Sequence, residues 1–109
     1  MSKWMGPADF DQIVGDITVN LLEGESTEYD LDGVTLRATR SARETWHVTR
    51  LPQEGVPAKT TIIERRPGFW LRRYDVYEQV EDGSFEPWCF SSLRRERMVA
   101  GAVDYLLAP

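Results

Sequence analysis

The side chains best suited to catalysis or metal binding are few in this sequence of 109 residues. His47 is the only histidine and Cys89 the only cysteine. Zinc sites combine several such ligands, so one chain cannot assemble the usual zinc set. A Cys89–His47 pair would be the one nucleophile–base pairing of these side chains. However, Cys89 alternates with Trp88 and Phe90, a pattern typical of an inert core thiol. We therefore expect no catalytic residue, no metal ligand and no cofactor here.

Other catalytic and phosphate-binding patterns are missing as well. The sequence contains no Gly-x-Ser-x-Gly turn and neither of the common glycine-rich phosphate loops. Asp30 and Asp32 flank a turn and lack the glutamate-terminated loop of a calcium site. Among the 18 acidic residues, no carboxylate pair is singled out for acid–base catalysis. The sequence therefore predicts a protein that is not an enzyme.

Arginine and aromatic residues gather between residues 46 and 74, and this segment is the most suggestive feature of the chain. Its members are Trp46, His47, Arg50, Arg65, Arg66, Phe69, Trp70, Arg72, Arg73 and Tyr74. Binders of single-stranded nucleic acid use such sets, because aromatic rings stack on bases and arginines hold phosphates. Against this, adjacent arginines on a strand point to opposite faces, and the net charge of the chain is −5. For this segment, a role in packing or in contact with a protein is therefore favoured over nucleic-acid binding.

Hydrophobic periodicity predicts a helix near each end of the chain. The first runs from about Ala8 to Glu23, with Pro7 suited to its first turn. Its apolar stripe comprises Phe10, Ile13, Val14, Ile17 and Leu21. The second follows a cap at Ser91 or Ser92. Its buried stripe is expected to comprise Val99, Ala102, Val103, Leu106 and Leu107, and its outer face Arg94, Arg97, Gly101 and Asp104.

Residues 27–91 are expected to form about six consecutive antiparallel strands. Asp32-Gly33 is a strong two-residue turn signal, because both positions must accept positive φ. It pairs Tyr29 with Leu36 on one side and Glu28 with Arg37 on the other. Further strands are expected at 45–51, 59–66, 69–80 and 85–91.

A second two-residue turn at Asp82-Gly83 pairs Val80 with Phe85 and Val76 with Cys89 on a face that resembles core. The opposite face then carries Phe69, Leu71, Tyr77, Trp88 and Phe90. If each helix covers one face, the domain has three layers. If both helices pack on one side, the other side is a large aromatic patch, which usually marks an interaction surface.

Together these elements predict one α+β domain, residues 1–109, with an N-terminal helix, a curled meander of about six strands and a C-terminal helix. The absence of a long apolar run and of a signal-like N-terminus favours a cytoplasmic protein. Residues 34–73 carry nine bases and three acids, whereas residues 1–33 carry eight acids and one base. Such blocks either create a bipolar surface or neutralise each other across neighbouring strands.

The leading hypothesis is a non-enzymatic, accessory or inhibitor-like module of bacterial or phage origin that binds a protein partner, or itself as a homodimer. The partner-binding residues are expected to be Trp46, Arg50, Arg65, Phe69, Trp70, Arg73, Tyr77, Trp88 and Phe90. Two alternatives are single-stranded nucleic-acid binding through the central strands, and a small apolar ligand held in the curled sheet.

Overall fold

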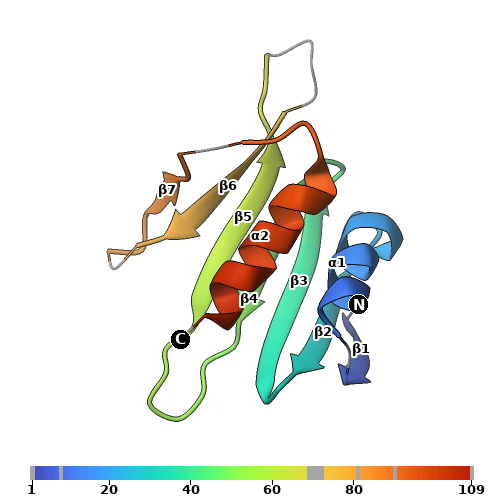
Figure 1. Ribbon diagram of the computed structural model, residues 1–109, viewed down its shortest axis with the longest axis vertical. Helices are drawn as coiled ribbons and strands as arrows, with labels where there is room; N and C mark the ends of the chain where they lie inside the picture. The colour runs from blue at the N-terminus through green and yellow to red at the C-terminus, as the bar shows by residue number, and fades with distance from the viewer. Residues whose placement is uncertain (1, 8, 69–72, 81, 90, 109) are drawn as a thin grey trace.

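A single open sheet of seven strands organises the chain (Figure 1). The computed structural model describes residues 2–7, 9–68, 73–80, 82–89 and 91–108. In chain order the elements are β1 (Ser2–Pro7), α1 (Phe10–Gly15), the π-helix η1 (Asp16–Asn20), β2 (Ser26–Leu31), β3 (Val34–Ala42), β4 (Thr45–Arg50), β5 (Lys59–Arg65), β6 (Tyr74–Gln79), β7 (Phe85–Pro87) and α2 (Arg95–Leu107). The strands lie side by side in the order of the sequence. Strands β2–β7 form the antiparallel meander, so the predicted α+β class is confirmed.

Strand β1 was not predicted. It pairs in parallel with β2, from Ser2 opposite Ser26 to Pro7 opposite Asp30. Pro7 therefore ends a strand instead of entering a helix. The helix begins at Phe10, and Asp9 caps it: the Asp9 carboxylate accepts the Gln12 N–H at 2.8 Å, and the Gln12 side chain accepts the Asp9 N–H at 3.0 Å. This reciprocal cap satisfies two backbone donors at the helix start.

The first helix widens into a π turn over its second half. Thr18 donates its hydroxyl to the Val14 carbonyl at 2.6 Å, and the Leu21 N–H reaches Asp16 O at 3.0 Å. The wider turn keeps Ile13, Ile17 and Leu21 on one side, and all three are buried. The expected stripe is therefore confirmed, although the helix ends at Asn20 and not at Glu23.

The β2–β3 hairpin has the predicted register. Asp32 and Gly33 have φ of 51° and 80°, as a two-residue turn of this kind requires. Tyr29 pairs with Leu36, and Glu28 forms an ion pair with Arg37 at 2.8 Å. Apolar and charged pairs fall on opposite faces, so both sides of the hairpin favour the same register.

The β6–β7 hairpin has a register that differs from the prediction by one residue. Gln79 pairs with Phe85 and Tyr77 with Pro87. The Asp82 carboxylate accepts the Ser84 N–H at 2.8 Å, which closes a longer turn than the expected two-residue one. Because side chains alternate between faces, the shift turns Phe85 away from the side on which Val76 is buried. The expected pairing of Val76 with Cys89 is wrong.

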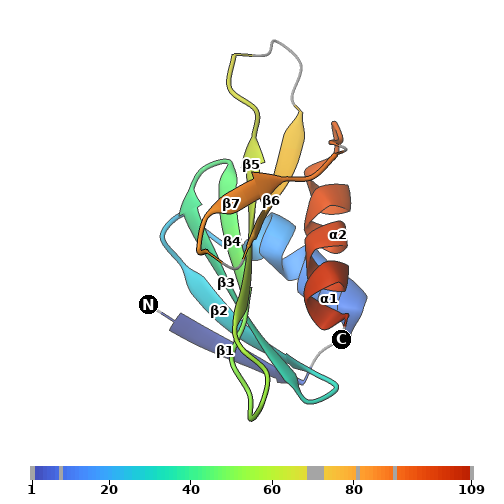
Figure 2. The same cartoon turned by 90° about the vertical axis from the view of Figure 1, so that its left-hand side faces the viewer.

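Both helices lie on the same side of the sheet (Figure 2). Helix α2 contacts β4, β5 and β6, and it also packs against α1 and η1. The core fills the space between the helices and the sheet and consists of Ile13, Ile17, Leu21, Tyr29, Leu36, Ala38, Trp46, Val48, Ile63, Tyr74, Val76, Met98, Val99, Ala102, Val103 and Leu106. No helix in the described ranges has the length and apolar character needed to cross a membrane.

Helix α2 departs from expectation at two positions. Ser92 does not cap it directly; its hydroxyl accepts the Arg94 N–H at 3.1 Å, one residue before the helix begins. Gly101 does not lie on a bare outer face, because the Trp88 ring packs over it and a Cβ there would be 3.3 Å from Trp88 Cζ3. Trp88 also contacts Tyr105 edge-on, with ring centroids 5.7 Å apart.

Three tyrosine–carboxylate hydrogen bonds tie distant segments together. Tyr29 of β2 donates to Asp16 of η1 at 2.5 Å, and Tyr105 of α2 donates to Glu78 of β6 at 2.6 Å. The third runs from Tyr74 to Glu44. Two of these bonds hold a helix onto the sheet, and a charged acceptor makes each stronger than a neutral pair.

The bond from Tyr105 predicts a loss of stability at alkaline pH. Its acceptor Glu78, together with burial, raises the pKa of Tyr105 from 10.0 to about 12. Because the pKa is higher in the folded than in the unfolded state, the bond stabilises the fold fully below pH 10 and is lost as the pH rises through about 12. Urea unfolding measures the free energy of unfolding of the wild type and of Tyr105→Phe across this pH range. The two free energies should converge as Tyr105 ionises. A constant difference between them would contradict the assignment.

Candidate functional site

The two tryptophans of the described chain that were predicted to bind a partner face the helices. Trp46 is fully buried. The Arg40 guanidinium lies 5.0 Å from its ring centroid and that of Arg95 lies 5.9 Å away. Trp88 is half-buried against Gly101 and Tyr105 of α2. The expected aromatic face on the side without helices is therefore not formed by these two residues, because their strands turn them to the core side.

The predicted arginines serve the fold in different ways. Arg50 donates to the Leu106 carbonyl at 3.0 Å and to that of Ala108 at 3.3 Å, so it satisfies carbonyls at the end of α2. Arg73 donates to Ser91 Oγ at 2.6 Å. Arg65 is half-buried at the end of β5. The remaining predicted positions Phe69, Trp70 and Phe90 lie outside the described residues.

Tyr77 is the predicted residue that lies on the side of the sheet without helices. The strand register places it in one row that crosses six strands and comprises Ser26, Thr39, His47, Ile62, Tyr77 and Pro87. Their strand neighbours two positions away share this side. We call the whole surface the uncovered face (Figure 2). The sequence predicted that Trp46 and Val48 alternate with His47 and Thr49 in the strand at 45–51, but it assigned the interaction to Trp46, which lies on the side of the helices.

The uncovered face is polar, and many of its groups are paired within it. Ser26 and Thr39 share a hydroxyl hydrogen bond of 2.7 Å, and Thr49 and Thr60 share one of 3.1 Å. Ion pairs join Glu28 to Arg37 and Asp75 to Arg66 near its edges. Polar groups that already have partners lose little when water is removed. Another molecule can therefore cover this face while these polar groups keep their hydrogen-bond partners.

Ile62 and Tyr77 form the apolar centre of the uncovered face. They are cross-strand partners, and both side chains are half-buried although no helix covers them. Burial, together with the nearby negative charges of Glu64 and Asp75, raises the pKa of the Tyr77 hydroxyl. The tyrosine therefore stays neutral near pH 7 and can donate or accept a hydrogen bond.

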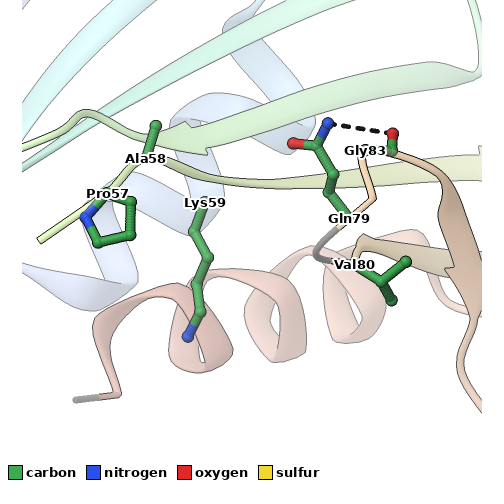
Figure 3. Close-up of a pocket in the computed structure, with 6 residues that line it drawn as sticks. All are labelled: Pro57, Ala58, Lys59, Gln79, Val80 and Gly83. Carbon is green, nitrogen blue, oxygen red and sulfur yellow. Dashed lines mark hydrogen bonds between the residues drawn. The ribbon is translucent and has the colours of Figure 1, made fainter.

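A hollow of about 460 Å³ lies between the start of β5, the end of β6 and the connection to β7 (Figure 3). It is lined by Pro57, Ala58, Lys59, Gln79, Val80 and Gly83. The polar side chains here are already engaged: Lys59 Nζ lies 4.3 Å from the Tyr105 ring centroid, and Gln79 donates to the Gly83 carbonyl at 3.2 Å. The hollow therefore offers no distinctive ligand chemistry.

Cys89 is exposed, which corrects the prediction of a core thiol. The register shift of the last hairpin explains the change, since it moves Cys89 off the side on which Val76 is buried. His47 lies on β4, and strands β5 and β6 separate it from β7, which ends at Pro87 two residues before Cys89. Strands β4 and β7 are about 14 Å apart. The two side chains therefore do not form a dyad. Nor do the described residues contain a group of three His, Cys, Asp or Glu side chains placed to hold a metal ion.

Comparisons with models of protein families, with curated proteins and with solved structures found no match.

Proposed function

We propose that this chain is a non-enzymatic protein-binding module, accessory or inhibitor-like and of bacterial or phage origin, that docks its partner on the uncovered face. One observation carries the proposal: both helices pack on one side of the sheet and leave the other side open (Figure 2). The residues assigned to the contact are Ile62 and Tyr77 at the centre, with His47 and the threonine pairs beside them.

The dimensions of the uncovered face suit a protein partner. Six strands about 4.8 Å apart and about six residues long give a projected area on the order of 500–600 Å². Stable complexes bury about 800 Å² of accessible surface per partner, and accessible surface exceeds projected area. An open sheet face of this size fits a protein surface better than a small ligand, which needs a concave site.

Binding of single-stranded nucleic acid is less well supported. That hypothesis relied on Trp46 and Trp70 to stack on bases. Trp46 is fully buried and two guanidinium groups lie over its ring, so the ring offers no free surface. Trp70 lies outside the described residues. On the face that remains open, Glu28 and Asp75 are paired with Arg37 and Arg66, and Glu64 adds a further carboxylate, so these groups give no surplus of positive charge for phosphates.

The test compares substitutions on and off the uncovered face. Ile62→Ser and Tyr77→Ser should leave the circular dichroism spectrum intact and reduce recovery of a partner from the native host at least tenfold. Val19→Ser is the matched control, because Val19 is an exposed apolar residue of η1 on the other side of the sheet. Captured proteins are identified by mass spectrometry and their affinities are then measured with purified material.

Two outcomes of this test are decisive. Equal recovery by the wild type and by both serine variants of the uncovered face would reject the proposal. Light scattering of the purified chain separates the possible partners: a dimer that dissociates in Tyr77→Ser but not in Val19→Ser identifies the partner as a second copy of this chain.

A further inference from the structure

Eight of the eleven arginines converge on one end of the molecule, although they come from four separate segments. These segments are 40–46, 64–66, 73–75 and 91–97, and we call them together the arginine end. Figure 1 shows the ends of β3 and β5 and the starts of β4, β6 and α2 meeting there, at the top of the view. The fold therefore brings arginines that are far apart in the sequence to one end of the molecule.

Backbone hydrogen bonds and an ion pair hold the four segments together. The Arg65 N–H donates to the Glu44 carbonyl at 3.1 Å, which joins β5 to the β3–β4 turn. Tyr74 and Ser92 exchange two backbone hydrogen bonds of 2.7 and 3.2 Å, which join β6 to the approach to α2. Arg95 lies 4.0 Å from the Glu44 carboxylate. The arginine end is thus a connected surface.

The arginine end is strongly positive within an acidic protein. Its segments contain eight arginines and four acids, whereas the whole chain has a net charge of −5. Helix α2, 13 residues long, begins there, and its N-cap residue Arg94 makes no side-chain cap bond. The positive end of the helix dipole therefore adds to the guanidinium charges.

Part of this charge is free to bind. Arg40 and Arg66 are engaged, with the Leu21 carbonyl and with Asp75 respectively. The guanidinium groups of Arg43, Arg94 and Arg97 are exposed, and none makes a hydrogen bond or ion pair with another residue in the described ranges. Exposed positive charges without partners at one end of the molecule favour a ligand that carries several negative charges.

We propose that the arginine end binds an acidic segment of a partner protein, through guanidinium–carboxylate pairs. The fold already contains one such pair, because Arg66 holds Asp75 with two hydrogen bonds of 2.9 and 2.6 Å. Planar guanidinium groups match carboxylates in this two-bond geometry. The site adjoins the uncovered face at that pair but does not depend on it.

A carboxylate-bearing segment fits this end better than a nucleic acid does. The described aromatic rings at the arginine end, Trp46 and Tyr74, are buried, so they cannot stack on bases. The backbone N–H of Arg40 donates to the Glu25 carbonyl. The acidic residues Glu23 and Glu25 therefore lie beside the arginine end on this side. A long polyanion would have to pass these acids, whereas a short acidic segment can end before them.

The test uses the full chain and a fluorescent peptide of alternating glutamate and serine, read by anisotropy at low ionic strength. The wild type should bind, and the affinity should fall steeply with added salt. Arg43→Ala and Arg97→Ala should each weaken binding about two- to fivefold, as expected for exposed charge pairs. Arg37→Ala is the matched control, because Arg37 is an exposed arginine of the uncovered face. A glutamine–serine peptide should not bind.

Each alternative result overturns the proposal in its own way. Absence of binding to the glutamate peptide removes the site. Tighter binding of a single-stranded oligonucleotide, lost in the Arg43 and Arg97 variants, makes the ligand a nucleic acid. If Arg37→Ala and Tyr77→Ser lose peptide binding while Arg43→Ala and Arg97→Ala keep it, the peptide binds the uncovered face. The peptide assay does not depend on the result of the partner-capture test. Either proposal can therefore fail while the other holds.

Discussion

Replacing Trp46 by alanine is expected to lower the free energy of unfolding by about 3–5 kcal/mol, the usual cost of truncating a buried tryptophan. The Trp46 ring is fully buried in the core. Arg40 and Arg95 lie over the ring, and the Tyr74 ring centroid is 6.3 Å away. The variant would leave a cavity and remove the ring that both guanidinium groups contact. Urea unfolding followed by circular dichroism measures the difference.

Trp46→Phe and Val19→Ala serve as controls. Phenylalanine keeps an aromatic ring beside the two arginines, so its cost should be clearly smaller. Val19 is 69% exposed, and its truncation should change stability by less than about 0.5 kcal/mol. A loss below about 1 kcal/mol in Trp46→Ala would mean that the ring is at the surface, where the sequence-based hypothesis of partner binding placed it.

The sequence predicted local features well where two independent signals agreed. At Asp32-Gly33 the turn residues and the pairing of Glu28 with Arg37 required the same register, and the structure has it. In the second hairpin only the Asp82-Gly83 signal was available. Asp82 there bonds Ser84, which lengthens the connection and shifts the pairing by one residue. One residue is enough to exchange the two faces of a strand.

Strand β1 was missed for a different reason. Parallel pairing of residues 2–7 with β2 has no turn between the partners and therefore leaves no local signature in the sequence. The segment also ends in Gly6-Pro7, which is typical of a loop or a helix start and not of a strand interior. Only the three-dimensional arrangement brings it to β2.

The candidate surfaces were predicted less well than the fold, because each depends on topology. The composition of residues 46–74 indicated an interaction surface, but alternation along β4 places Trp46 under the helices and His47 on the uncovered face. The arginine end combines residues up to 57 positions apart, such as Arg40 and Arg97. No sequence window contains both, so the charge blocks predicted a bipolar surface only as one of two outcomes.

Replacing Tyr29 by phenylalanine is expected to cost about 1.5–3 kcal/mol, which is large for the loss of one oxygen atom. The Tyr29 hydroxyl donates to the Asp16 carboxylate at 2.5 Å, in a part-buried position between η1 and β2. Without that donor, the carboxylate keeps its charge but has lost the protein group that replaced water. Burial and the bond to Asp16 also raise the pKa of Tyr29, so its contribution is complete below pH 10 and declines as the phenol ionises.

A double-mutant cycle with Asp16→Asn separates this bond from general effects of burial. If the hydroxyl acts through the carboxylate, the cost of Tyr29→Phe should fall by about 1 kcal/mol or more in the Asp16→Asn background. Additive costs would show that the two residues stabilise the fold independently. Coupling is the expected result, because this bond is a side-chain link that holds the widened end of the first helix on the sheet. The same link holds the first helix on the side of the sheet where α2 also packs, and so leaves the uncovered face open.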